Sequence, residues 1–137
     1  MRFVTGESRI KGITEADAQR LIDSDVTSLG NLLERGATTK GRKELSAATG
    51  ISPDLILTWV NYADLARING IGAECANILE AAGVDTVVEL ANRNPTNLHE
   101  RLAAVNQDAG LVQVMPSEAQ VADWVDQAKQ LGRSVHY

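Results

Sequence analysis

Residues that could perform chemistry are few and scattered in this 137-residue chain. It has one cysteine, Cys75, and two histidines, His99 and His136, whose separations are unlike those of metal-ligand sets. Cys75 follows a glycine turn near an expected helix start, which can activate a thiol, but a packed structural cysteine is the better interpretation. No phosphate-binding loop, nucleophile elbow or dinucleotide fingerprint occurs. We therefore predict no enzyme, no metal site and no cofactor.

A glycine hinge that occurs twice is the stronger signal. Residues 10–14 read Ile-Lys-Gly-Ile-Thr, and residues 68–72 read Ile-Asn-Gly-Ile-Gly. Glycines allow backbone angles that other residues avoid, and backbone amides at a helix N-terminus suit a phosphate or another anion. In the first copy a threonine replaces the second glycine. The predicted contact positions for a phosphate or a partner are Gly12, Ile13, Thr14, Gly70, Ile71 and Gly72.

Sequence matches 58 residues apart continue beyond the hinge. They pair Ala18 with Ala76, Leu21 with Leu79, Val26 with Val84, Leu32 with Leu90 and Arg35 with Arg93. A second match, 65 residues apart, pairs the segments that begin at Trp59 and Trp124. Such periods indicate two copies of one supersecondary unit. We expect both tryptophans to be buried in equivalent places rather than to serve as ligand platforms.

Most of the chain carries sequence signals for α-helices, and these helices must position the residues described above. Capping residues and three- or four-residue apolar spacing predict about eight to ten short helices. The expected starts are Thr14, Thr27 or Ser28, Thr39, Ser52, Ala73, Thr86, Asn94 and Ser117. The predicted fold is all-α, with two pseudo-repeated units that share one core, each closed by a Trp-bearing helix. The predicted parts are an N-terminal tail over 1–9, repeats over 10–65 and 66–132, and a C-terminal tail over 133–137.

The hinge over 65–72, followed by Ala76, Leu79, Gly83 and Leu90, resembles the helix-hairpin-helix motif. Residues 52–131 more closely resemble an uncharacterised bacterial domain family with helix-hairpin-helix character. The phrases that carry this resemblance begin at Trp59, Ala81 and Pro116. The wider superfamily implies sequence-independent DNA binding, in which hairpin amides contact phosphates and a nearby basic residue adds charge. Here acidic residues, Glu15 and Glu74, follow the hinges, so this chemistry is not intact in either copy.

The net charge of the chain indicates which class of partner it can bind. The net charge is −5, and the whole acidic excess lies in residues 68–137, which disfavours an extended phosphate backbone. We therefore predict a protein-interaction, scaffold or adaptor module with a protein partner. The alternative is weak, sequence-independent binding of DNA or RNA through the hairpins and a basic patch. That patch would comprise Lys11, Lys40, Arg42 and Lys43.

Location follows from composition. A single cysteine excludes an internal disulfide and favours a reducing compartment. No apolar run approaches the roughly 20 residues of a membrane helix, and the first residues lack a secretory apolar stretch. We expect a soluble, cytoplasmic protein without a membrane partner.

Overall fold

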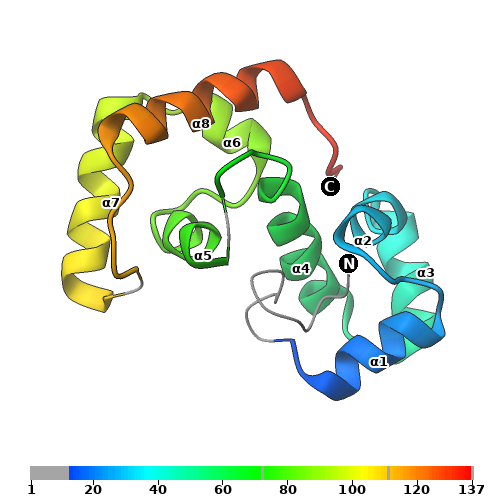
Figure 1. Cartoon of the computed structure of the whole chain (residues 1–137). Helices are drawn as coiled ribbons and strands as arrows, with labels where there is room; N and C mark the ends of the chain where they lie inside the picture. The colour runs from blue at the N-terminus through cyan, green and yellow to red at the C-terminus, as the bar shows by residue number, and fades with distance from the viewer. Residues whose placement is uncertain (1–12, 72, 111, 137) are drawn as a thin grey trace. The chain divides into compact units, whose positions relative to one another are not determined.

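The computed structural model describes residues 13–71, 73–110 and 112–136, apart from the side chains of Ala73 and Glu74. Within these ranges the regular elements are eight α-helices, and no strand occurs (Figure 1). The all-α prediction is confirmed. The helices are α1 (Glu15–Asp23), α2 (Leu29–Arg35), α3 (Thr39–Thr49), α4 (Pro53–Leu65), α5 (Ala73–Ala81), α6 (Val87–Ala91), α7 (Pro95–Ala109) and α8 (Glu118–Leu131).

The chain divides into two compact units. The first unit comprises Met1–Asp64 together with Ser134–Tyr137, and the second comprises Leu65–Arg133. The division at 64–65 lies next to the predicted repeat boundary. Residues 134–136, predicted as a tail, instead belong to the first unit. The chain therefore passes from the first unit into the second and returns to the first.

Capping side chains explain where the helices begin. Thr14, Ser28, Thr38, Thr86 and Asn94 each accept a hydrogen bond from a backbone amide three residues later. Such a bond satisfies one of the donors that the first helical turn leaves unpaired. A capping box precedes α8, in which the side chains of Ser117 and Gln120 each bond to the other's backbone amide.

Aliphatic side chains and one tryptophan fill the core of each unit. In the first unit α2 packs on α3, and in the second α8 packs on α6 and α7 while α5 packs on α7. Trp59 is fully buried in the first unit and Trp124 is 3% exposed in the second, as predicted. The other fully buried side chains include Leu21, Leu32, Leu45 and Ile56 in the first unit, and Ile78, Leu79 and Leu90 in the second.

The connection from α1 to α2 and the connection from α5 to α6 share one hydrogen-bond scheme. The amide of Val26 donates to the Leu21 carbonyl at 2.9 Å, and the amide of Val84 donates to the Leu79 carbonyl at 2.8 Å. The chain takes a positive φ just before each valine, 68° at Asp25 and 92° at Gly83. Helices α1 and α5 begin 58 residues apart, and so do α2 and α6. The backbone path therefore follows the spacing of the sequence matches.

Two arginines brace these connections, although their carbonyl partners differ by one position along the two turns. Arg35 Nη1 donates to the Ser24 carbonyl at 3.0 Å, and Arg93 Nη2 donates to the Gly83 carbonyl at 3.3 Å. Each side chain thus returns from the end of the second helix to the loop that precedes it.

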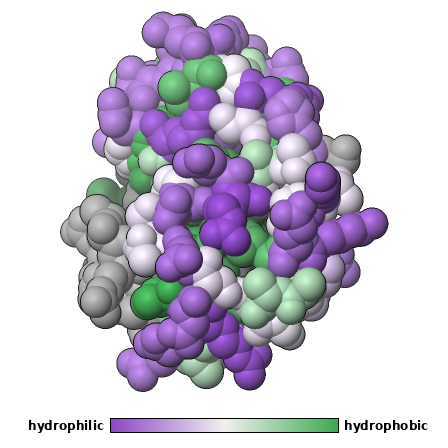
Figure 2. All heavy atoms as spheres, turned by 90° about the vertical axis from the view of Figure 1, so that its right-hand side faces the viewer, coloured by the Kyte–Doolittle hydropathy of each residue, from purple (hydrophilic) through white to green (hydrophobic). Residues whose placement is uncertain are grey.

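Hydrophilic side chains cover most of the face drawn in Figure 2, and hydrophobic ones show there as small areas between them. Within the described residues, no helix combines the length and hydropathy required to cross a bilayer.

Candidate functional site

The turn after α4, which contains the second predicted hinge, is closely defined from Ile68 to Ile71. Ile68 and Ile71 are 1% and 7% exposed, so both anchor the turn in the core of the second unit. The amide of Ile71 donates to the Ile68 carbonyl at 3.3 Å. Gly70 has a φ of 98°, a conformation that glycine adopts readily and other residues rarely adopt. Gly72 lies outside the described residues.

The side-chain amide of Gln127, on α8, forms hydrogen bonds to this turn through both its oxygen and its nitrogen. Its Oε1 accepts from the Asn69 backbone amide at 2.9 Å, and its Nε2 donates to the Asn69 carbonyl at 3.1 Å. Nε2 also donates to Asp123 Oδ2, one helical turn earlier, at 2.8 Å. The amides of Asn69 and Ile71 are therefore engaged within the protein, and neither is oriented toward a ligand.

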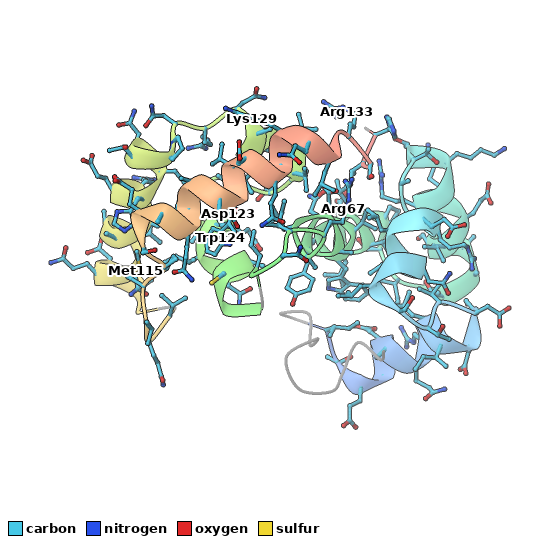
Figure 3. The ribbon with its side chains drawn as sticks, turned by 45° about the horizontal axis from the view of Figure 1, so that its top comes forward. Arg67, Met115, Asp123, Trp124, Lys129 and Arg133 are labelled. Carbon is cyan, nitrogen blue, oxygen red and sulfur yellow. The ribbon has the colours of Figure 1, made fainter. Side chains whose placement is uncertain are left out.

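Trp124, also on α8, contacts the same turn. A Cβ placed on Gly70 would lie 3.1 Å from Trp124 Nε1, closer than side chains normally approach. Figure 3 shows Trp124 beside Asp123 on α8. Glycine at position 70 is thus favoured by the close approach of the indole as well as by its φ.

Arg67, at the start of this turn, bonds to the end of α8. Its Nη2 donates to the Leu131 carbonyl at 3.1 Å, and its Nη1 donates to the Gly132 carbonyl at 3.2 Å. A positively charged donor on the last carbonyls of a helix also interacts favourably with the helix dipole. Arg67 and Gln127 therefore hold this turn against α8 within the second unit.

The first predicted hinge is described from Ile13 onward, so Lys11 and Gly12 lie outside the described residues. Ile13 is 6% exposed and packs in the core of the first unit. Thr14 caps α1, and its Oγ1 accepts from the Asp17 amide at 3.1 Å. Glu15 is exposed beside it. A carboxylate at this position would repel an approaching phosphate.

Arg42, which the sequence places in a basic patch, does not lie at the surface. It is 5% exposed. Its Nη1 donates to the Gly36 carbonyl at 2.8 Å, and its Nη2 donates to Thr39 Oγ1 at 3.1 Å and to the His136 carbonyl at 2.8 Å. Lys40 and Lys43 are exposed. Of the three patch residues that the structure describes, two thus remain available to a polyanion.

Residues considered for catalysis do not come together. Nowhere in the described part of the chain do three or more His, Cys, Asp or Glu side chains form a group able to hold a metal ion. His99 Nε2 lies 3.2 Å from the Pro116 carbonyl and so helps to hold the loop before α8. Cys75 is half-buried on α5.

The exposed surface of α8 carries negative charge. Glu118, Asp123 and Asp126 are exposed along this helix, with Lys129 nearer its C-terminus. Gln127 holds Asp123, while Glu118 and Asp126 are available at the surface. This helix belongs to the half of the chain that contains the acidic excess.

Residues 11–131 match the family model of a domain of unknown function (DUF4332). The chain belongs to this family. The matched range begins at the first hinge and ends at the last residue of α8, so the DUF4332 domain includes both predicted repeats. It extends the resemblance noted over residues 52–131 to the first half of the chain. Searches of curated proteins and of solved structures give no match.

Sequence reasoning missed the residues that fix the turn after α4 and residues 134–136 of this DUF4332 protein. Arg67 and Gln127 carried no signal because their partners are backbone atoms about 60 residues away. The burial of Arg42, by contrast, did have a signal in the sequence. Arg42 lies three residues before the buried Leu45 and therefore on the same face of α3.

Proposed function

We propose that this protein is a non-catalytic binding module of helix-hairpin-helix type, built from two copies of one unit, and that its partner is a protein. The bond between the Asn69 amide and Gln127 carries the proposal. A hairpin that binds phosphate needs outward-facing amides, whereas this amide is held by α8 of the same unit. The hairpin then serves to join helices, and binding is left to the side chains on the helix surfaces.

The acidic side of α8 is the surface that we assign to the partner. Glu118 and Asp126 are exposed on it. Negative charge at the rim of an interface speeds association with a basic surface and discourages nucleic acid. We therefore expect the partner to present lysine and arginine side chains to this helix.

Nucleic-acid binding remains the second candidate, because Lys40 and Lys43 are both exposed on the early turns of α3. Two lysines can neutralise few phosphates, so this binding would be weak, independent of sequence and steeply reduced by salt. Titration of labelled duplex and single-stranded DNA and RNA at about 150 mM salt tests it. We expect no retained binding, and sub-micromolar affinity lost on Lys40→Glu/Lys43→Glu substitution would reverse the assignment.

Capture of partners from nuclease-treated extract tests the protein assignment. The wild-type protein should retain a defined protein that high salt releases, and Glu118→Gln/Asp126→Asn should lose it. Lys40→Gln/Lys43→Gln is the matched control, since it removes two exposed charges of the opposite sign and should retain the partner. Capture that disappears with nuclease, or with the lysine variant alone, would contradict the proposal.

A further inference from the structure

Asn69 and Gly70 form a pair of residues that can react with each other. Among the asparagines of the chain, Asn69 is the only one that glycine follows. The backbone nitrogen after an asparagine is held near the side-chain amide by the chain itself, and glycine has no Cβ to cover that nitrogen. Both residues are exposed, whereas Ile68 and Ile71 on either side are buried. The reactive pair is therefore open to water.

The backbone nitrogen of Gly70 is not engaged as its neighbours are. The Asn69 amide donates to Gln127 Oε1, and the Ile71 amide donates to the Ile68 carbonyl. Within the described residues, no group accepts a hydrogen bond from the Gly70 amide. This nitrogen can therefore lose its proton to water or hydroxide without first breaking a hydrogen bond.

The backbone of Asn69 is held by what we call the Gln127 clamp, the two hydrogen bonds of 2.9 and 3.1 Å from the Gln127 side chain to the Asn69 amide and carbonyl. Attack on the side chain requires the Gly70 nitrogen to eclipse Asn69 Cβ, an arrangement outside the common backbone regions. The peptide unit between the two residues must rotate to reach it. The Asn69 carbonyl belongs to that unit, so rotation breaks its bond to Gln127, and reaction requires local opening of the clamp.

We propose that Asn69 is a site of spontaneous deamidation and that the Gln127 clamp controls the rate. Hydroxide removes the Gly70 amide proton, and the nitrogen attacks Asn69 Cγ. The new N–Cγ bond forms as the Cγ–Nδ2 bond breaks, and Nδ2 leaves as ammonia with a proton from water, which regenerates hydroxide. Water then opens the cyclic imide at one of its two carbonyls. The product is aspartate, or isoaspartate in which the main chain runs through Cβ.

Isoaspartate is incompatible with the Gln127 clamp. Its free carboxylate is the former Asn69 carbonyl, the group to which Gln127 Nε2 donates. The same nitrogen donates to Asp123 Oδ2 at 2.8 Å, so two carboxylates would share one donor and repel each other. The modification thus replaces a hydrogen bond by a like-charge contact and loosens the turn from α8.

Incubation of the full-length protein in mildly alkaline buffer, followed by peptide mass spectrometry and an isoaspartate assay, measures the rate at each asparagine. We expect Asn69 to react first, and Gln127→Ala to accelerate it about fivefold or more, the factor that loss of one net hydrogen bond corresponds to. Asn106→Ala is the matched control. Asn106 clamps Val112 in the same way, with bonds of 2.9 and 3.1 Å to its amide and carbonyl. Its removal should leave the rate at Asn69 unchanged.

Circular dichroism verifies that both variants fold. A folded Gln127→Ala protein that reacts no faster at Asn69 than the wild type would overturn the proposal, and so would equal acceleration by Asn106→Ala. A peptide of residues 65–74, which lacks the clamp, serves if Gln127→Ala fails to fold. It should react at Asn69 about fivefold or more faster than the folded wild-type protein. Equal rates in peptide and protein would show that the clamp has no control over the reaction.

Discussion

Asp25 and Gly83 occupy the same place in two turns that share their hydrogen bonds, yet one has a side chain and the other has none. Both residues have a positive φ, and each precedes a buried valine. Glycine adopts this conformation without strain, whereas aspartate is one of the few other residues that tolerate it. The same backbone turn is thus formed with either residue, and we expect its contribution to stability to differ between the two.

Tyr62 and Gln127 form a second contrast. Each lies three residues after the buried tryptophan of α4 or α8. Gln127 uses its side-chain amide to fix the turn at Asn69, while Tyr62 is a largely buried ring on α4. One position thus supports its unit through polar bonds to the backbone in one half and through apolar burial in the other.

The largest expected effect comes from the tryptophans. Trp59→Ala and Trp124→Ala should each lower the free energy of unfolding by about 3–5 kcal/mol, because each removes a buried ring from a packed core. Urea denaturation followed by circular dichroism measures both. Similar losses would support equivalent roles, and a loss below about 1 kcal/mol at either position would break the comparison.

Trp59→Phe sharpens that test. Trp59 Nε1 is buried and has no hydrogen-bond partner among the described residues. A buried donor without a partner is unfavourable, so replacing the indole by a phenyl ring removes that penalty while keeping most of the packing. We expect Trp59→Phe to be clearly less destabilising than Trp59→Ala in the same experiment.

The next effect concerns the turn that contains Gly70. Gly70→Ala should lower the free energy of unfolding by about 1–3 kcal/mol, since it combines a strained φ with crowding by Trp124. Gly50→Ala is the control, because Gly50 has a φ of 77° but no atom within 4 Å of an added Cβ. The difference between the two losses isolates the crowding term. Equal losses would mean that Trp124 does not restrict this turn.

The sequence predicts the features of this molecule that depend on neighbouring residues and misses those that depend on distant ones. Helix starts and the buried tryptophans depend on nearby residues and on regular spacing, so Thr14, Ser117 and Trp59 could be interpreted directly. Gln127 and Arg42 bond to backbone atoms that only the folded chain brings near. The burial of Val135 likewise depends on a chain that returns to its first unit, which no local pattern in a polar tail indicates.

A smaller effect follows from exchanging the two turn residues. Asp25→Gly should raise the free energy of unfolding by about 0.5 kcal/mol, because relief of the left-handed strain slightly exceeds the entropy that glycine loses on folding. Gly83→Asp should lower it by about 1 kcal/mol for the same reason in reverse. Thermal unfolding of both variants checks the signs. Destabilisation by Asp25→Gly would show that the aspartate side chain makes a favourable contact.

The smallest effect should appear only in alkali. Desolvation by burial raises the pKa of Tyr62 above its ordinary value of about 10. The unfolded chain then loses this proton at a lower pH than the folded protein does, so the stability that Tyr62 contributes is complete below pH 10 and is lost as the pH rises through its raised pKa. Urea denaturation at pH values on either side of 10 measures the slope. Tyr62→Phe should flatten it, whereas Tyr137→Phe, the matched change at the only other tyrosine, should leave the Tyr62 contribution in place. An unchanged slope in Tyr62→Phe would show that the ring is open to water, and the contrast between a buried Tyr62 and a hydrogen-bonded Gln127 would then fail.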